Sequence, residues 1–402
     1  MAKVVDPLFD PFSPAFRADP YPVFERLRRE APIYWSPILK AYVLTRHRDI
    51  ARVLADPSFL PSPLRQNTAT LMARAGRSLP AVDRLIEAAV IFDTTPGHRA
   101  ARRMMAAALN TRPLSEYAPA IAAIADEIIG GLEGRPTFDA ITEFADPLPV
   151  RVIHHVLGIP PELFETMGRL TAGLPAMFNY LNAVRDLIAW EGQVREAFDV
   201  LGDAVRERRA RPREDGLSRM VQIGAQDGIE DEQLAARVMF LVMVGSETTA
   251  ATLGNAIRHA IDVPEAAAAA RDAAAMPAVS EELIRLEGTS LFAARYATRD
   301  SIVGEVAMPA GTGVYPYMAA ANRDPEAYAE PDRFIPGRGG PPHMSFGDGI
   351  HACIGASLAR LESRIAINAF FTRLQPLRRA GPDRWAPFDA FRHMASLPVA
   401  VG

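Results

Sequence analysis

The spacing of apolar residues predicts a chain built largely of helices. Apolar positions recur at helical intervals over residues 20–33 and 48–56, and again over most of residues 97–132 and 161–211. Between residues 59 and 79, prolines and glycines recur without a period, which indicates a loop-rich segment. We therefore expect helices to dominate the first half of the chain.

The most informative helix is expected from near residue 231 to about residue 262. Its centre, RVMFLVMVGSETTAATLG, is apolar on every side, which is typical of a helix buried in the middle of a protein. A polar residue near Asp231 is placed to cap its amino end. Two further helices, PEAAAAARDAAAMPA and AVSEELIRLEG, are expected to follow.

Extended segments are expected mainly beyond residue 288, in ARYATRD, SIVGEVAMPAGTGVYPY and ASLPVAVG, with AYVLTRH from residue 41 as an earlier piece. No convincing repeat or linker divides the chain. The predicted fold class is therefore mainly α with a smaller β portion towards the C-terminal half, in a single domain over residues 1–402.

Composition adds several exclusions. A net charge of −4 over 402 residues gives no overall basic excess for nucleic acid binding, and a single cysteine cannot form an internal disulfide. The longest apolar run, residues 238–245, is far shorter than the roughly 20 residues that cross a bilayer. The amino end resembles no signal peptide. We expect a cytoplasmic protein with no membrane contact.

The single cysteine stands in HMSFGDGIHACIG, residues 343–355, and an amphipathic segment, ASLARLESRIAINAFF, follows at once. Glycine permits backbone angles that let a tight loop fold beneath a flat ligand. Cys353 would lie at the amino end of the next helix, where the helix dipole and unpaired N–H groups favour a thiolate. The pattern F-G-x-G-x-H-x-C-x-G is made by Phe346, Gly347, Gly349, His351, Cys353 and Gly355.

A lone thiolate suits zinc poorly, because zinc takes about four protein ligands in a closed site, and it suits an iron that already has four nitrogen ligands. A lone cysteine is also commonly a small buried apolar residue. The whole stretch, through LARLE, resembles the haem-binding signature of the cytochrome P450 family of haem-thiolate monooxygenases. This resemblance implies that Cys353 is the proximal iron ligand of haem b, which would lie between the long central helix and the helix after the cysteine loop.

The segment VGSETT, residues 244–249, places an acid and hydroxyls inside the apolar helix, where polar groups are costly without a partner or a task. Thr248 can return its hydroxyl to the carbonyl of Val244, and such a local widening could admit water or dioxygen. Alternatively, the backbone merely satisfies Thr248, and Glu247 faces a water pocket. The segment resembles the oxygen-activation helix of the family, which implies that Glu247 and Thr248 are catalytic. Val244 replaces the usual alanine or glycine and should narrow the space above the iron.

The resemblance also implies residues that hold the haem and the fold. Two buried propionates need cationic or hydrogen-bonding neighbours, and the family positions fall on His98, Arg102, Arg295 and His351. By spacing alone, Glu282 and Arg285 form an ordinary i, i+3 surface pair. By resemblance they form the structural E-x-x-R motif, which Arg333 of EPDRF joins. The substrate pocket would be lined by Leu241, Val244, Leu291, Phe292 and Met394, although these residues fit a packed core equally well.

The resemblance covers almost the entire chain and implies a monooxygenase that inserts one atom of dioxygen into a small or medium apolar organic substrate, by hydroxylation, demethylation or epoxidation. Cys353 would favour O–O cleavage, while Glu247 and Thr248 would deliver protons. A separate ferredoxin or flavodoxin with its reductase would supply the electrons, docking on a basic patch of Arg99, Arg102, Arg103 and Arg338.

Two alternative functions remain open. A peroxide-driven oxygenase or decarboxylase of the same fold tends to lack the acid and the alcohol of the long helix. A haem-binding sensor without turnover does not need a pair that delivers protons.

Overall fold

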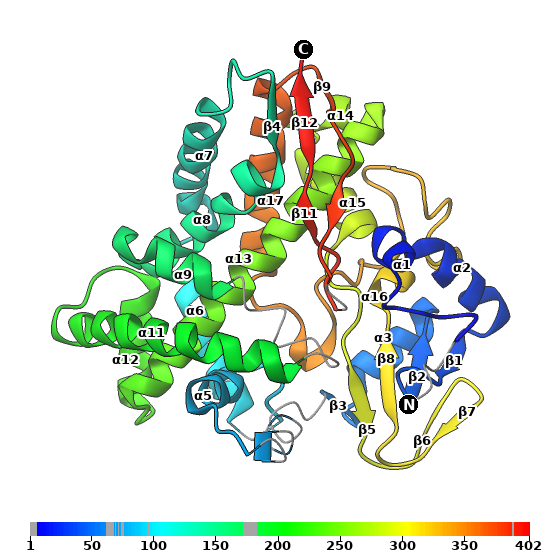
Figure 1. The fold of residues 1–402 in the computed structure, drawn as a ribbon, viewed down its shortest axis with the longest axis horizontal. Coiled ribbons are helices and arrows are strands. Elements are labelled where there is room, and N and C mark those ends of the chain that lie inside the picture. The colour runs from blue at the N-terminus through cyan, green and yellow to red at the C-terminus, as the bar shows by residue number, and fades with distance from the viewer. Residues whose placement is uncertain are drawn as a thin grey trace.

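The computed structural model describes residues 6–171 and 183–402, apart from residues 62–67, 69, 71, 74–75, 95–96 and 388–389. Helices make up most of it, and α13 (Asp231–Asp262) runs through the middle of the helical body (Figure 1). Around it lie α5 (Pro80–Ala88), α6 (His98–Leu109), α7 (Leu114–Gly130), α8 (Pro147–Leu157), α9 (Phe164–Thr171), α11 (Ala183–Ala210), α12 (Gly216–Gln226) and α17 (Ala356–Arg373).

The bounds predicted for the long helix are confirmed. Apart from half-buried Arg237, residues 234–243 are all buried, as expected of a helix that is apolar on every side. The expected side-chain cap is absent, because N-terminal Glu230 makes no capping hydrogen bond; Asp231 and Glu232 instead place negative charge in the first turn. Among the described helices, α13 has the length and hydropathy of a membrane span, but 72% of its most apolar window is buried inside the fold.

The largest sheet has five strands in the order β1 (Ile33–Ser36), β2 (Ala41–Leu44), β8 (Gly313–Pro316), β5 (Arg295–Ala297) and β3 (Phe59–Pro61). It lies at the side of the helical body (Figure 1). β2 and β8 pair in parallel, and the other neighbours pair antiparallel. The expectation that the strands gather towards the C-terminal half is thus partly wrong, because three strands of this sheet precede residue 62. Ile33, expected in a helical stripe, starts β1.

Smaller sheets complete the β portion. β4 (Thr137–Asp139), β12 (Pro398–Val401) and β9 (Leu377–Arg379) form one sheet, while β6 (Ser301–Val303) pairs with β7 (Val306–Met308) and β10 (Arg384–Trp385) pairs with β11 (Met394–Ser396). The remaining helices are α1 (Pro14–Ala18), α2 (Tyr21–Glu30), α3 (His47–Ala55), α14 (Pro264–Ala270), α15 (Met276–Glu287), α16 (Met318–Ala321), the π-helix η1 (Ile141–Ala145), and the 3₁₀ turns η2 (Pro161–Leu163) and η3 (Gly349–His351).

Two sequence predictions fall partly outside the described residues. Most of the loop-rich segment after β3 is one of them, and the middle of the helical stretch 161–211 is the other. The described parts of the second stretch are helical, in η2, α9 and α11.

Candidate active site

The cysteine loop turns tightly just before α17, as the glycine pattern predicts. The Gly347 amide donates to the Met344 carbonyl at 2.9 Å, and the Cys353 amide donates to the Phe346 carbonyl at 2.8 Å. Gly347 and Gly349 both have φ +68, a conformation that residues with a Cβ rarely adopt. At Gly349 a Cβ would also lie 2.6 Å from the carbonyl oxygen of Leu54. These contacts explain why the loop carries glycine at both positions.

The loop is also held by side chains of α15 and α17. Glu281 of α15 accepts from Nε2 of His343 at 2.6 Å and from Nε of Arg360 at 2.8 Å. The Arg360 guanidinium lies 4.4 Å from the centre of the Phe346 ring. These contacts position the loop between two helices of the core, and the sequence analysis did not find them.

Cys353 precedes the first residue of α17 by three positions. Its side chain is accessible only by way of the cavity that it lines, and protein atoms surround the sulfur. Burial of the thiol among protein atoms raises its pKa, and this outweighs the lowering by the backbone N–H groups of Gly355 and Ala356 and by Arg102 and Arg360. The N–H groups at the helix start thus favour the thiolate, as expected, but burial has the larger effect on the free thiol. A metal ion bound to the sulfur would remove the proton outright.

One cavity extends from the cysteine loop to α13. Its walls include Phe346, Gly347, Cys353 and Gly355 on the loop side and Leu241, Val244 and Thr248 on the helix side. Phe292 also lines it, and Arg102, Arg295 and His351 contribute polar groups. The cavity thus joins most of the residues that the sequence analysis assigned to the haem and to the substrate.

Two predicted pocket residues lie elsewhere. Leu291 and Met394 are buried but do not line the cavity among the described residues. The terminal methyl group of Met394 lies 3.8 Å from where a Cβ on Gly254 would be, so Met394 packs near α13 in the core. The alternative that apolar residues there serve core packing therefore holds for these two.

Cationic groups gather at the cavity beside the cysteine loop. The rings of His98, at the start of α6, and His351 lie 4.6 Å apart between centres. Arg102 donates to the carbonyl of Ala352 at 2.6 Å, and Arg295 is 8% exposed. Burial, together with the charges of Arg295, His98 and Arg102, lowers the pKa of His351 to about 3.

This cluster fits an anionic ligand. Nε2 of His98 and both ring nitrogens of His351 are buried and have no hydrogen-bond partner among the described residues. Buried polar atoms of this kind usually have a partner. The two carboxylates of a haem would supply partners and charge of the required sign, so the residues present fit haem b.

The hydroxyls of α13 bond back to the helix. Thr248 donates to the carbonyl of Val244 at 2.6 Å, as predicted, and Thr252 donates to the carbonyl of Thr248 at 2.8 Å. The helix nevertheless remains continuous from Asp231 to Asp262. Thr248 lines the cavity, so its oxygen can still accept a hydrogen bond from a group bound there.

Among the residues that the structure describes, Glu247 is not one of those that line the cavity. Its carboxylate lies 3.0 Å from Nδ1 of His393, immediately before β11, and its side chain is 16% exposed. The sequence analysis missed His393, because no spacing connects it to the long helix.

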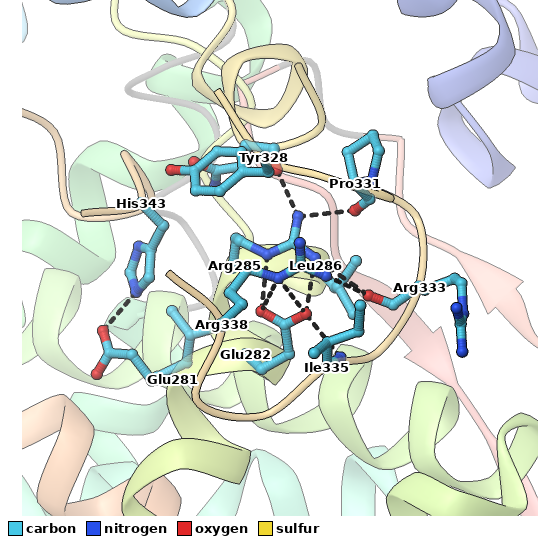
Figure 2. A network of polar contacts seen from close by, with 12 residues as sticks. Glu281, Glu282, Arg285, Leu286, Tyr328, Pro331, Arg333, Ile335, Arg338 and His343 are labelled. Atoms are coloured by element: carbon cyan, nitrogen blue, oxygen red, sulfur yellow. Dashed lines mark hydrogen bonds and ion pairs between the residues drawn. The ribbon is translucent and has the colours of Figure 1, made fainter. Parts of the chain in front are cut away.

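The E-x-x-R motif forms a buried ion-pair network (Figure 2). Nε and Nη2 of Arg285 donate to the two carboxylate oxygens of Glu282, each at 2.8 Å. Nη1 of Arg285 donates to the carbonyl of Pro331 at 2.8 Å. Glu282 also accepts from Nε of Arg338 at 2.8 Å and from the amide of Ile335 at 3.0 Å.

The expectation that Arg333 joins this network through its side chain is wrong. The side chain of Arg333 is 69% exposed and pairs with Glu330, pointing away from Glu282 in Figure 2. Arg338, expected in an exposed basic patch, takes that place with a side chain that is 10% exposed. The chain turns between the two arginines so that Arg333 contributes only its carbonyl, which accepts from Arg338 at 2.7 Å.

Separate alanine substitutions of Arg338 and Arg333 distinguish the structural roles of the two side chains. Arg338→Ala should cost about 3–5 kcal/mol of unfolding free energy, because it removes one partner of a buried charge. Arg333→Ala, the matched control, should leave the urea midpoint and the haem content unchanged. Equal midpoints for the two variants would contradict the corrected assignment.

Glu362, the last residue of the LARLE segment of α17, also lines the cavity. It is 2% exposed, and Oε1 has no hydrogen-bond partner among the described residues. Burial raises its pKa to about 8, so the carboxyl group is mostly protonated at neutral pH.

A cavity between a buried central helix and a cysteine loop, with a cationic cluster beside the loop, defines a haem-thiolate class of protein. Comparison with known proteins supports this class. Residues 191–377 match the family model described as Cytochrome P450. The cyclomarin C epoxidase CymV of Salinispora arenicola is 33% identical over 365 residues, which cover 88% of this chain and 89% of that protein. The vitamin D(3) 25-hydroxylase of Pseudonocardia autotrophica is 30% identical over 402 residues, 98% of this chain and 96% of the relative.

Solved structures give the same result. CalO2 superposes with a TM-score of 0.90 at 27% identity, over 98% of each chain. P450BioI, in complex with an acyl carrier protein ligated to hexadec-9Z-enoic acid, gives a TM-score of 0.88 at 27% identity, over 96% of this chain and 100% of that chain. The chain belongs to the cytochrome P450 family, whose members bind haem b, and it is a monooxygenase.

Proposed function

We propose that this enzyme holds haem b through Cys353 and inserts one atom of dioxygen into a small or medium apolar organic substrate. The observation that carries the proposal is the shared cavity, with Cys353 and the cationic cluster on one side and Thr248 on another. When bound, haem supplies the activation of dioxygen, with two electrons from a reductant.

The residues of the chain divide this work. In the proposal, Cys353 is the metal ligand, Arg102 and Arg295 neutralise the propionates, and the neutral rings of His98 and His351 donate hydrogen bonds to them. Phe346, Gly347 and Gly355 shape the face of the loop beneath the haem. Glu247 gives a proton to the hydroxyl of Thr248, which presents a proton to the cavity.

The lining supports an apolar substrate. Leu241, Val244 and Phe292 line the cavity near Thr248, and an apolar wall binds by burying carbon surface. Relatives act on varied substrates, since their names include an epoxidase, a hydroxylase and the nocardicin C N-oxygenase of Nocardia uniformis subsp. tsuyamanensis. Hydroxylation, epoxidation and demethylation all remain within the proposal.

We propose a ferredoxin or flavodoxin, with its reductase, as the electron donor. Two arginines of the predicted docking patch are unavailable, because Arg102 contacts the cysteine loop and Arg338 binds Glu282. Arg99 and Arg103 remain exposed. Ile350, which is 64% exposed and precedes His351 in the sequence, supplies an apolar contact for the donor.

Three further expectations belong to this proposal. The core cluster that runs from Phe9 to Val399 supports one catalytic domain over the whole chain. Burial of α13 supports a cytoplasmic enzyme without a membrane span. Glu247 beside Thr248 favours turnover driven by a reductant over a peroxide-driven enzyme or a sensor.

The test uses protein loaded with haem b. A panel of terpenoids, aromatic acids, fatty acids and macrolide precursors is first screened for a shift in the haem spin state. Compounds that bind are then incubated with NADH, ferredoxin and reductase under ¹⁸O₂, and we expect one ¹⁸O atom in each product molecule. Product with peroxide but not with the reductase would favour the peroxide-driven alternative, and binding without any product would favour the sensor.

A further inference from the structure

Glu247 belongs to a chain of three titratable side chains that continues away from the cavity. Nδ1 of His393 lies 3.0 Å from Oε1 of Glu247, and Nε2 of the same ring lies 3.8 Å from Oδ1 of Asp146. The three residues come from α13, from the position before β11, and from the junction between η1 and α8. The imidazole thus lies between two carboxylates, with one near each ring nitrogen.

The exposure of these side chains gives the chain a direction. The Asp146 side chain is 42% exposed, whereas those of His393 and Glu247 are 11% and 16% exposed. Thr248, next to Glu247, lines the cavity. The series therefore begins at solvent and ends beside the cavity.

Local structure fixes the geometry of this chain. Asp139, at the end of β4, accepts from the amides of Ile141 and Leu397 at 2.9 and 3.2 Å, and so joins η1 to the C-terminal strands. Gly254, two helical turns after Glu247, leaves room for Ile141, because a Cβ there would collide with that side chain. A π-helix such as η1 is frequent at functional sites.

The charges around the ring favour its protonated form. Burial lowers the pKa of His393, but the hydrogen bond and charge of Glu247 and the charge of Asp146 outweigh burial, so the pKa is raised. Partial burial of Asp146, with the negative charges of Glu247 and Asp139, raises its pKa to about 6, although His393 opposes this. Asp146 therefore exchanges protons near neutral pH, and His393 holds its second proton to a higher pH than a free imidazole does. Among the described residues, Glu247, Asp146 and Asp139 are the acids that act on this pair.

We propose that Asp146 and His393 form the outer part of the proton path that supplies Glu247. His393 acts through Glu247 and is a positioning residue that also relays protons. Each proton that Glu247 passes to Thr248 is replaced from Nδ1 of the His393 imidazolium, which leaves a neutral ring with its proton on Nε2. A rotation of the ring then presents the bare Nδ1 to Asp146 or solvent, which protonates it and restores the imidazolium. The 3.8 Å gap can be bridged by one water or a small rotation. This inference rests on the proposed role of Glu247.

The experiment compares four variants of the haem-loaded enzyme with its ferredoxin and reductase. Glu247→Gln tests the inner group, His393→Gln removes the titrating ring but keeps an amide, and Asp146→Asn removes the outer acid. His155→Gln, at an exposed histidine of α8, is the matched control. For each variant we measure the rate of product formation, product per NADH, the solvent isotope effect, haem content and substrate affinity.

We expect His393→Gln to lower the coupled rate about tenfold, less than the roughly hundredfold or more that a general acid supplies. Its haem content and substrate affinity should match those of the control. In the wild type, the rate should fall as pH rises through the raised pKa of His393, and this limb should disappear in His393→Gln. In Asp146→Asn the loss of a negative charge should lower the pKa of His393 and move the limb to lower pH.

The outcomes separate the relay from the proposed function. Impaired Glu247→Gln with impaired His393→Gln and an altered pH profile supports the relay. Impaired Glu247→Gln with an unchanged His393→Gln overturns the relay and leaves the proposed function intact. An unchanged Glu247→Gln overturns the relay and the proposed proton role of Glu247, whereas the proposed function fails only if the wild type itself forms no labelled product. If His393→Gln loses haem, Asp146→Asn decides, since an unshifted pH profile there overturns the relay.

Discussion

Replacing Cys353 with alanine should abolish the absorption that a thiolate gives to the reduced carbon monoxide complex. No other cysteine is present in the chain, so no second sulfur can replace the lost ligand. The cavity would keep Arg102 and Arg295, whose charges still attract the propionates, and His351, whose ring can still donate a hydrogen bond. We therefore expect the variant to retain some haem while product formation falls to background.

Ser357→Ala is the matched control for this substitution, because the residue is exposed and lies in the first turn of α17. It should preserve the spectrum, the haem content and the activity. A thiolate spectrum in Cys353→Ala would overturn the ligand assignment. Equal loss of haem in both variants would instead show that this helix start tolerates no change.

Sequence patterns predict those parts of this fold in which local chemistry determines the structure. The approximate bounds of the long helix could be predicted because its apolar centre and its flanking polar residues both lie within one segment. The partners of a strand are less accessible to this reasoning. β2 and β8 pair in parallel although their residues are about 270 positions apart. The sequence of Ala41–Leu44 does not indicate which strand will pair with it.

The candidate site shows the same division. The motif around Cys353 predicts the loop because Gly347 and Gly349 each occupy a position with a positive φ, which is a local property of the backbone. Arg333 and Arg338 are both arginines in one irregular segment, and only the turn between them decides which side chain reaches Glu282. His393 is paired with Glu247 solely by tertiary packing, so no pattern could have joined them.

The cysteine illustrates a limit of a different kind. Its position at a helix start was predicted, but the sign of its pKa shift was not. Burial depends on how many protein atoms surround the sulfur, and in this fold that effect exceeds the effect of the helix terminus. A sequence motif shows which groups lie near the cysteine along the chain. It does not show whether burial or the helix terminus has the larger effect on the pKa of the thiol.

Replacing Thr248 with alanine should separate electron consumption from product formation. The substitution removes the hydroxyl that lines the cavity and bonds to the carbonyl of Val244 at 2.6 Å. Alanine favours helices more than threonine does, and α13 is held by burial along much of its length, so the fold should persist. Without the Thr248 hydroxyl, no side-chain group carries protons from Glu247 to the cavity. Product per NADH should fall about tenfold or more, with hydrogen peroxide rising in proportion.

Thr248→Ser is the matched variant, because it keeps the hydroxyl and loses only a methyl group. It should restore most of the yield per electron, whereas a defect caused by packing alone would appear in both variants. NADH consumption, hydrogen peroxide and product are measured together, with the haem spectrum as a check on the site. An unchanged yield in Thr248→Ala would show that protons reach the cavity by a path that does not include this hydroxyl. The path through His393 and Glu247 would then have no outlet at Thr248.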